Sequence, residues 1–304
     1  MRILKPLRRS LTNHWVLYLF ILVPIVHTFI FSYIPMYGVT LAFKDYSIKA
    51  GILGSKWAGL KYFQKFLNTP NIDQYIINTI KISIYSLLWG FPAPILLALL
   101  LNEVRNGIFK KAVQMATFAP YFISTVVVVG MIMQILSIRG GMVNNLIGLF
   151  GVGPINFMGK ASAFRTIYIA SGIWQGTGYS SVLYFAALSS VDPTLYEAAI
   201  IDGASRLQKI RHIDIPAILP TITLSLIMSV GNIMSVGADK AYLLQNNLNI
   251  ATSEIISTHV YKMGLINGQY SYSTAVGLLN TAINLVLLIT VNKIAQHVGE
   301  TSMW

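Results

Sequence analysis

The sequence of 304 residues contains no cysteine and few charged residues. Without cysteine the chain has no disulfide, no thiolate metal site and no cysteine nucleophile, and the sequence gives no indication of the redox compartment. Only 11% of the residues are charged, against about 25% in soluble domains, whereas 55% are hydrophobic. The composition therefore predicts a membrane-embedded protein in which one integral domain fills most of the chain.

The long apolar runs of the sequence contain almost no ionisable side chains. Crossing about 30 Å of hydrocarbon takes about 20 apolar residues, and six runs are long enough: 15–35, 76–101, 113–137, 165–188, 217–238 and 273–294. Apart from the lone imidazole of His27 and residues near the ends of the runs, no ionisable group lies in them. A charge at mid-bilayer costs at least about 2.5–3.5 kcal/mol, and carriers coupled to protons or sodium usually keep carboxylates there. If this chain moves a solute uphill, we expect the energy to enter from outside the bilayer.

Motifs for catalysis and metal binding are also missing from the sequence. It contains no G-x-x-x-x-G-K-[ST] loop for phosphates and no His-Glu-x-x-His zinc motif. Neither paired carboxylates nor a Ser/His/Asp set falls in a plausible cleft. We therefore expect no catalytic residue, no metal ligand and no cofactor on this chain, and we predict that it is not an enzyme.

The formal net charge of +12 comes mostly from lysines and arginines between the apolar runs. This placement indicates contact with anionic lipid headgroups rather than with nucleic acid. Four basic residues, Arg2, Lys5, Arg8 and Arg9, precede the first run and favour a cytoplasmic N-terminus. The first run is too long for the core of a signal peptide, the alternative, and no small-x-small cleavage site follows it, so we interpret it as an uncleaved span. An even number of spans then places both termini and the 189–216 segment in the cytoplasm.

Prolines bear on the interpretation of the second and fifth apolar runs. Gly90, Pro92 and Pro94 predict a kink or a break in the second run. Pro216 and Pro220 mark the entry into the fifth run. Proline kinks are common in membrane proteins of many kinds, so they indicate no particular function.

A polar segment between the fourth and fifth runs carries the most specific pattern in the chain. Asp192 and Pro193 are typical of a helix start, a short helix is predicted over 194–201, and Gly203 permits a sharp turn. A second short helix is predicted over 205–212. From the residues alone, this segment is either a compact knob that docks on another surface or an amphipathic connector lying on the headgroups.

The same segment resembles the EAA loop of the permease subunits of ABC importers. It reads E-A-A-x-x-D-G-A and is followed by I-x-I-P-x-x-x-P, a pattern similar to the signature of binding-protein-dependent (MetI-like, type I) importer permeases. Residues 56–63 are similar to the W-x-G-L-x-N-F segment of carbohydrate permeases, except at the position of the usual Asn. Residues 119–124 and 174–179 also look like that group. The resemblance covers nearly the whole chain and is strongest to the polysaccharide (LplB-like) branch of the oligosaccharide permeases.

The resemblance implies an all-α membrane protein with six transmembrane helices in the type I ABC importer permease (MetI-like) fold. Residues 1–75 would hold an N-terminal cytoplasmic segment, the first transmembrane helix and an external loop. Residues 76–294 would form the ABC transmembrane type-1 domain with the EAA coupling loop at 192–216, and residues 295–304 a cytoplasmic tail. The chain would be a multi-pass protein of the bacterial plasma (inner) membrane with both termini cytoplasmic.

Two sets of site residues follow from the resemblance. In the family the EAA loop seats in a cleft of the ATPase, which makes Glu197, Ala198, Ala199, Asp202, Gly203 and Ala204 the coupling positions. In maltose-type permeases the stretches corresponding to the fourth and fifth runs line the sugar cavity, which implies a substrate pathway of Trp174, Gln175, Gly176, Tyr179, Asn232 and Ser235. Amides, hydroxyls and aromatic rings suit a neutral, hydroxyl-rich sugar. The same residue types also pack membrane helices together, so helix packing stays the alternative for the second set.

The implied function is that of a permease subunit in an ATP-driven, binding-protein-dependent importer of oligosaccharides or polysaccharide fragments, working by alternating access. Its partners would be a second permease subunit, most simply as a heterodimer, two ATPase subunits that bind ATP and Mg, and an extracellular solute-binding protein. Two rival hypotheses remain. One is a membrane-embedded enzyme, such as a lipid-linked transferase, and the other is a channel or carrier that works without an ATPase.

Overall fold

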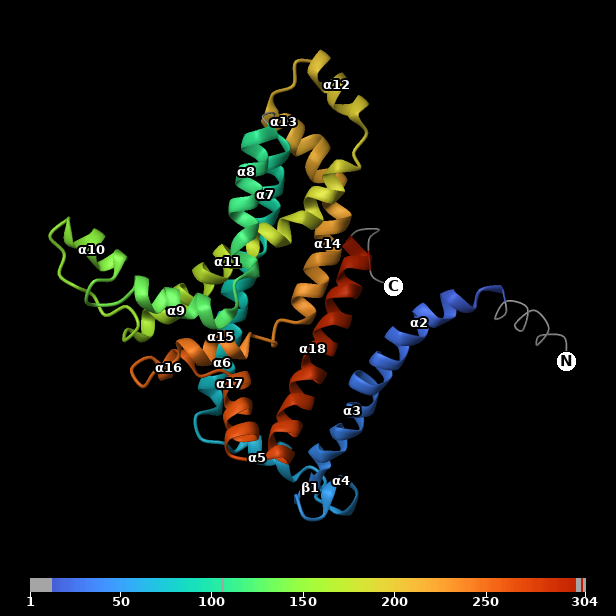
Figure 1. The fold of residues 1–304 in the computed structure, drawn as a ribbon, viewed down its shortest axis with the longest axis vertical. Helices are drawn as coiled ribbons and strands as arrows, with labels where there is room; N and C mark the ends of the chain where they lie inside the picture. Colours follow the sequence, from blue (N-terminus) through green and yellow to red (C-terminus); the bar gives the residue numbers. More distant parts are fainter. Residues whose placement is uncertain (1–12, 105–106, 299–301, 303–304) are drawn as a thin grey trace. The chain divides into compact units, whose positions relative to one another are not determined.

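The structure is a computed structural model that describes residues 13–104, 107–298 and 302, nearly all of them in helices or their connections (Figure 1). It divides into two compact units. Unit 1 is Met1–Asn68 with Met263–Leu278, and unit 2 is Thr69–Lys262 with Leu279–Trp304. The basic N-terminal residues Arg2, Lys5, Arg8 and Arg9 lie outside the described residues, and so do residues 299–301, 303 and 304 of the predicted 295–304 tail. The predicted boundaries at 75/76 and 294/295 stay predictions.

Unit 1 begins with a long apolar helical segment. It comprises α2 (Trp15–Thr28), the π-helical η1 (Phe29–Tyr33), α3 (Ile34–Met36) and the 3-10 helix η2 (Tyr37–Phe43). The segment is long and apolar enough to cross a membrane, and no side chain of α2 is buried. A helix that is apolar on every side and uncovered by its own chain suits contact with lipid or with another membrane helix.

A small polar region follows this helix in unit 1. It contains the two-residue strands β1 (Lys44–Asp45) and β2 (Lys56–Trp57), paired antiparallel, and the short helices α4 (Gly51–Gly54) and α5 (Lys61–Leu67). Lys61 Nζ lies 2.7 Å from Asp45 Oδ2, and the Tyr62 hydroxyl donates to the same carboxylate. The hydrogen bonds from Lys61 and then Tyr62 hold the pKa of Asp45 below its ordinary value. Lys61 and Tyr62, adjacent in the sequence, therefore share one local partner.

Unit 2 contains the remaining helices. They are α6 (Ile72–Tyr85), η3 (Ser86–Gly90), α7 (Pro92–Asn102), α8 (Gly107–Phe118), η4 (Ala119–Phe122), α9 (Thr125–Ile135), α10 (Met142–Gly148), α11 (Ala161–Ser189), α12 (Pro193–Ile201), α13 (Arg206–Lys209), η5 (Ile210–Asp214), α14 (Ile215–Gly231), α15 (Ala238–Leu244), α16 (Ile250–Ser253) and α17 (Ile256–Tyr261). A π-helical turn, η6 (Lys262–Ile266), leads toward α18 (Tyr270–Val298), whose part from residue 279 belongs to this unit. The long helix α11 is central, because it packs against α7, α8 and α14.

Five of the six predicted apolar runs fall wholly or mostly in one helical segment, but these segments differ in polarity. Within the described ranges, four helical segments are long and apolar enough to cross a membrane: Trp15–Phe43, Ile72–Asn102, Arg206–Gly231 and Tyr270–His297. The fourth run forms the 29-residue α11, whose serines, glycines and Gln175 make it more polar than these four. The predicted all-α membrane class is confirmed, and the β1–β2 pair is a minor exception to it.

The third predicted run, 113–137, is not one straight helix. It is divided between α8 and α9, which are bent by 104° at a short break. Pro120, buried in η4, has no N–H to donate, and the Ser124 side chain accepts a hydrogen bond from Val127 N at the start of α9. The chain thus ends one helix and begins another within a run whose composition alone favours a single helix.

Prolines widen three helices without ending them. The π-helical stretches η1, η3 and η5 each end two residues before a proline, at Pro35, Pro92 and Pro216. A proline ring clashes with the carbonyl four residues earlier, and that residue lies in the middle of each π-helical stretch. The wider turn relieves the clash. The irregularity expected at Gly90, Pro92 and Pro94 takes this form, and the helix continues to Asn102.

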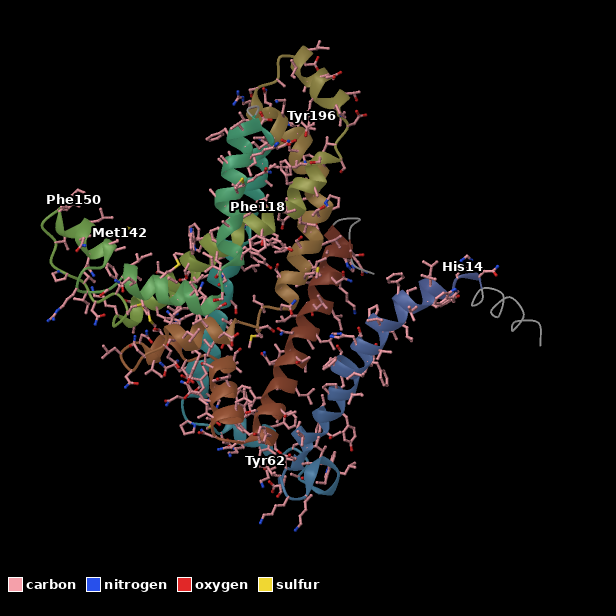
Figure 2. All side chains as sticks on the ribbon, viewed as in Figure 1. His14, Tyr62, Phe118, Met142, Phe150 and Tyr196 are labelled. Atoms are coloured by element: carbon pink, nitrogen blue, oxygen red, sulfur yellow. The ribbon has the colours of Figure 1, made fainter. Side chains whose placement is uncertain are left out.

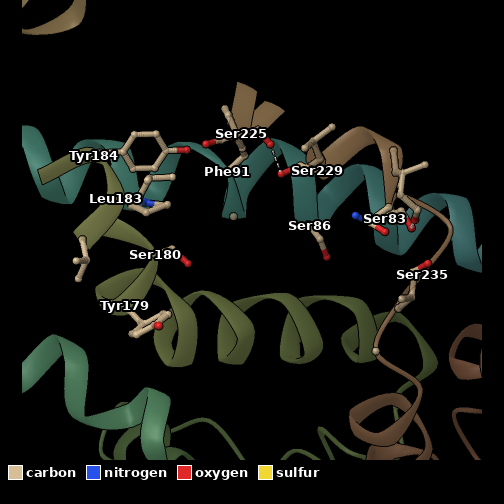
Figure 3. Close-up of a pocket in the computed structure, with 18 of the residues that line it drawn as sticks. Ser83, Ser86, Phe91, Tyr179, Ser180, Leu183, Tyr184, Ser225, Ser229 and Ser235 are labelled. Carbon is tan, nitrogen blue, oxygen red and sulfur yellow. Dashed lines mark hydrogen bonds between the residues drawn. The ribbon is translucent and has the colours of Figure 1, made fainter. Parts of the chain in front are cut away.

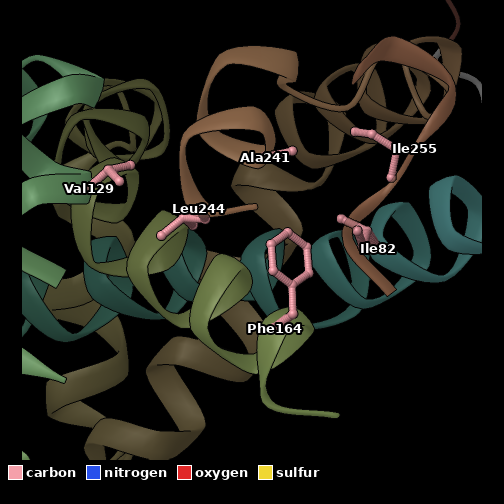
Figure 4. Packing of buried hydrophobic residues seen from close by; sticks show 6 residues of the cluster. All are labelled: Ile82, Val129, Phe164, Ala241, Leu244 and Ile255. Carbon is pink, nitrogen blue, oxygen red and sulfur yellow. The ribbon is translucent and has the colours of Figure 1, made fainter. Parts of the chain in front are cut away.

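Two buried apolar clusters hold unit 2 together. One contains Ile82, Val129, Phe164, Ala241, Leu244 and Ile255 (Figure 4), and the other contains Ala98, Leu99, Tyr184, Leu188 and Ile218. Because α11 contributes Phe164 to the first and Tyr184 and Leu188 to the second, it joins the two clusters. The space between them along α11 is where the unit is hollow.

Candidate functional site

The EAA-like segment forms a sharp helical corner, residues 192–205, which we call the α12 corner. It lies at the end of unit 2 near α13 and the ends of α7 and α8 (Figure 1). At the end of α12, Ala204 N donates to Ala199 O at 2.9 Å and Gly203 N donates to Ile200 O at 3.1 Å. This pair of bonds is the Schellman motif, and it needs a left-handed residue at Gly203, whose φ is +73°. The spacing of alanine and glycine in the signature is therefore that of a helix C-terminus.

Side-chain caps fix the two ends of the corner. Asp192 accepts a hydrogen bond from Thr194 N at 2.9 Å, and this bond holds the pKa of the Asp192 carboxyl below its ordinary value. Beyond the turn, Ser205 and Gln208 form a reciprocal capping box that begins α13. Local side-chain caps therefore define where the corner begins and where it ends.

The second predicted short helix, 205–212, is not a separate element. Residues Arg206–Gly231 form one continuous helical segment through α13, η5 and α14. Pro216 was expected to mark the entry into the fifth run, but η5 accommodates it inside the segment. A movement of the α12 corner therefore reaches α14 along a continuous helix.

The surface of the corner is apolar as well as charged. Leu195, Ile200 and Ile201 of the corner, and Leu207 just after it, are large apolar residues that stay exposed, Ile201 to 85%. Of the predicted coupling residues, Glu197, Ala198, Asp202 and Gly203 are exposed, whereas Ala199 and Ala204 are partly buried within the turn. Exposed apolar side chains gathered beside small residues are typical of a protein-binding surface.

One buried polar contact ties α12 to the helices beneath it. The Tyr196 hydroxyl, labelled in Figure 2, donates to Asp214 Oδ1 at 2.5 Å, and Asn102 Nδ2 lies 3.5 Å from both groups. Burial raises the pKa of Tyr196 to about 12, and the bond to Asp214 adds to the shift. The side chain of Asp214 is completely buried, and its Oδ2 has no hydrogen-bond partner. Tyr196 therefore connects α12 to the junction of α7 with α14.

A second polar contact reinforces this junction. Lys209 Nζ lies 3.2 Å from Glu103 Oε1, and both side chains are mostly buried. Arg206 Nε is 4.0 Å from the same carboxylate but is largely exposed, so it adds little. These residues join the end of α7 to the start of the long α13–α14 segment. Sequence reasoning missed Tyr196, Asp214, Asn102 and Glu103, although the acidic residue inside the I-x-I-P pattern was a visible signal.

A cavity of about 940 Å³ lies in unit 2 between α6, α7, α11 and α14 (Figure 3). Hydroxyl side chains dominate its polar lining: Ser83, Ser86, Ser180, Ser225, Ser229, Ser235, Tyr168, Tyr179 and Tyr184. None of the described residues that line it is charged. Such a wall offers hydrogen bonds and aromatic faces to a neutral polyhydroxyl surface.

The predicted pathway residues divide among three hollows. Tyr179, Asn232 and Ser235 line the large cavity. Gly176 lines a neighbouring cavity of about 220 Å³, and Gln175 with Gly176 lines a third of about 480 Å³. Trp174 lines none of the three and is half exposed. The serines of α6, η3 and α14 escaped sequence reasoning because serine in an apolar run is equally typical of helix packing.

Some polar groups near the cavity are already used by the protein. Gln175 Nε2 donates to Ile123 O at 3.0 Å, and Tyr179 stacks on Tyr121 with ring centroids 3.9 Å apart. Ser229 donates to Ser225 O, and Asn232 donates to Met228 O. Because these donors serve the backbone, the oxygen atoms of the serine hydroxyls stay available as acceptors. In the part of the chain that the structure describes, no cluster of three or more His, Asp or Glu side chains is suited to a metal ion.

Comparisons with known proteins agree with this geometry. The family described as "Binding-protein-dependent transport system inner membrane component" matches residues 90–300. The polygalacturonan/rhamnogalacturonan transport system permease protein YteP of Bacillus subtilis (strain 168) is 43% identical over 300 residues, covering 99% of this chain and 94% of that protein. Protein LplB of the same organism is 39% identical over 288 residues, covering 95% and 91% of the two chains. A crystal structure of a bacterial alginate ABC transporter, in complex with alginate pentasaccharide-bound periplasmic protein, shares 37% identity over 97% of this chain and 99% of that chain, with a TM-score of 0.87.

Proposed function

Because the chain belongs to the family of binding-protein-dependent transport system inner membrane components, we propose that it moves oligosaccharides or polysaccharide fragments across the membrane through the cavity beside α11. Members of this family are multi-pass membrane subunits of ABC transporters and are not enzymes. The ATPase is therefore a separate chain, and ATP with its Mg would be bound there. The saccharide assignment is supported by the named cargo of YteP and of the alginate transporter.

The α12 corner is the observation that carries the proposal. It is a capped, rigid corner with exposed apolar residues, and it connects to the bundle through Tyr196 and the continuous α13–α14 segment. In this proposal Ile201 and Leu195 enter a cleft of the ATPase, with the six coupling residues Glu197, Ala198, Ala199, Asp202, Gly203 and Ala204 shaping the contact. The corner then lies in the cytoplasm, and so do both termini.

The proposed partners are a second permease subunit, two ATPase subunits and a solute-binding protein. The crystal structure of the alginate transporter is a complex with alginate pentasaccharide-bound periplasmic protein, which supports the last of these. In the proposed cycle the binding protein delivers the saccharide, closure of the ATPase pair on ATP draws the corners together, and the cavity opens outward. Hydrolysis returns the cavity to the inside. This chain contributes helices that move during the cycle and the residues of the cavity that contact the sugar.

The decisive experiment places a bulky charged residue in the corner. We expect Gly203→Glu to leave membrane insertion intact but to separate ATP hydrolysis from saccharide uptake, because a side chain at φ +73° distorts the Schellman turn. A matched control is Gly151→Glu, since Gly151 also has a positive φ of +77° and open space around it. Both variants would be measured for uptake and ATPase activity in the reconstituted transporter. Normal coupled uptake by Gly203→Glu would overturn the coupling role.

A channel or carrier that works alone is the surviving rival. Its hallmark would be saccharide uptake by the purified pair of permease subunits in vesicles without any ATPase. We expect no uptake until ATPase subunits and ATP are supplied. Uptake without them would defeat the proposal and support the rival.

A further inference from the structure

Lys240 on α15 is a buried cation without an acidic partner. Its side chain is 9% exposed, its Nζ donates to Tyr168 O at 3.0 Å, and it lies 5.1 Å from the centroid of the Tyr168 ring. No carboxylate among the described residues lies within 4 Å of it, and the adjacent Asp239 is exposed. Lysine is almost never buried without a partner, so a negatively charged group is the partner that this site calls for.

A second cation on the same side of α11 is also unmatched. Arg165 lies three residues before Tyr168, on the same face of the helix. Its Nη2 donates to Asn78 Oδ1 at 3.0 Å, but its buried Nε has no hydrogen-bond partner. No carboxylate of the described residues is within 4 Å of it either. The nearby acid Glu254, whose backbone bonds to Asn78, already pairs with Lys262 at 2.6 Å.

The residues that surround the Lys240 ammonium also line the hollows of unit 2. Tyr168 lines the cavities of about 940 and 220 Å³, and Gly172 lines the cavities of about 220 and 480 Å³. A Cβ atom added to Gly172 would stand 3.4 Å from Lys240 Nζ. Because glycine has no side chain, nothing from residue 172 covers the ammonium. The positive charge therefore lies directly behind a cavity wall that contains no charge of its own.

We propose that Lys240, helped by Arg165 one helical turn before Tyr168 on α11, attracts and binds the carboxylate of an acidic saccharide, so that this transporter takes uronic-acid oligosaccharides. The inference rests on the proposed saccharide pathway and names its substrate class. Hydroxyls of the wall bind the neutral ring positions, and the buried ammonium supplies the one interaction that a neutral sugar does not use. A carboxylate from the second permease subunit has the same chemistry, but the cavity-lining residues around Lys240 favour the cargo. The expectation of a neutral sugar, made from sequence, changes accordingly.

The test uses the assembled transporter in lipid vesicles with its binding protein at saturating concentration. The probes are a galacturonic acid oligomer and its methyl ester, which has the same rings without the charge. We expect Lys240→Met to lower uptake of the acid about 10- to 100-fold, the range for a hydrogen bond to a charged group, and to leave uptake of the ester unchanged. Lys240→Arg should keep most of the uptake of the acid. Comparing each variant with wild type for the same ligand cancels the selectivity of the binding protein.

Two further variants keep the test decisive. Lys160→Met removes an exposed lysine at the start of α11 and should change neither uptake. Gly172→Val keeps Lys240 but covers it, and should lower uptake of the acid selectively even if Lys240→Met fails to assemble. Equal losses for acid and ester, or loss of the second permease subunit from Lys240→Met with normal acid uptake by Gly172→Val, would overturn the inference and assign Lys240 to subunit contact. Failure of the wild-type transporter to take up either oligomer would overturn the inference, and it would refute the saccharide function only if other oligosaccharides were not taken up either.

Discussion

The α12 corner and the cavity beside α11 are built in opposite ways. The corner satisfies its polar groups with its own neighbours, through Asp192, Ser205 and the turn at Gly203, and it exposes apolar side chains. The cavity differs, since serine and tyrosine hydroxyls supply most of its polar lining and lie among apolar residues such as Leu87, Phe91 and Leu183. A surface that meets one protein can be rigid and apolar, whereas a path for a polyhydroxyl solute needs many weak polar contacts.

Ile201→Asp is expected to have the largest effect on this comparison. Ile201 is 85% exposed, so the substitution should leave the fold unchanged. If Ile201 is an anchor of the docking surface, burying an aspartate there should weaken ATPase binding about 30-fold or more. Co-purification of the ATPase and a titration by light scattering measure this. Phe150→Asp is the matched control, because Phe150 is 84% exposed in the segment after α10; an equal loss in the control would show that the corner is not special.

Tyr196→Phe should give the next largest effect. It removes only the hydroxyl that donates to Asp214, which leaves a second oxygen of a fully buried carboxylate with only the long contact from Asn102. An unsatisfied buried group of this kind costs about 1–3 kcal/mol. Thermal unfolding of the detergent-solubilised subunit should shift downward, and the ATP hydrolysed per saccharide transported should rise. An unchanged ratio of ATP hydrolysed to saccharide transported would mean that the Tyr196–Asp214 bond stabilises the corner without transmitting movement.

Asn232→Leu tests the other side of the comparison. Asn232 lines the cavity and donates to Met228 O, so leucine removes polar contacts with little change of volume. We expect saccharide uptake to fall about tenfold, as for the loss of one hydrogen bond of ordinary strength, while ATPase binding stays normal. Ser189→Ala, on α11 outside the cavity, serves as the control. Reduced ATPase binding in the asparagine variant would erase the distinction between the two regions.

The smallest effect is expected from Lys61→Asn, which removes the charge of an exposed ion pair. The Lys61–Asp45 pair is about half exposed on both sides, so it contributes less than about 1 kcal/mol. The mostly buried Lys209–Glu103 pair should respond much more strongly to Lys209→Met. Unfolding midpoints at low and high salt measure both variants. A larger loss for Lys61→Asn than for Lys209→Met would contradict the assignment of structural weight to the α7–α14 junction.

The α12 corner could be predicted from sequence because it is a local structure. Its caps, its turn and its exposed residues all lie within fourteen residues of one another. The spacing of Asp192, Gly203 and Ser205 therefore predicts the positions of the caps and of the turn. The continuity of α13 with α14 could not be predicted, because a π-helical stretch removes the stop that Pro216 normally signals. The broken third run was missed for a related reason, since apolar composition hides the roles of Pro120 and Ser124.

The cavity was harder to predict because its residues come from distant parts of the chain. Ser86, Tyr179 and Asn232 meet only after α6, α11 and α14 have packed. The unmatched charge of Lys240 was equally hidden, because in sequence it stands beside Asp239 and looks paired. Burial and the direction of a side chain decide these matters, and both depend on tertiary contacts.

The turn at Gly203 depends on the handedness of the residue at that position. Its φ of +73° falls in the region that the mirror-image form of any other amino acid occupies without strain. No neighbouring atom lies within 4 Å of a Cβ placed there, so size is not what excludes a side chain from the free subunit. A D-alanine introduced by chemical ligation should therefore preserve transport where L-alanine impairs it. At this residue the stereochemistry of the backbone, rather than the size of the side chain, favours glycine, because glycine is achiral.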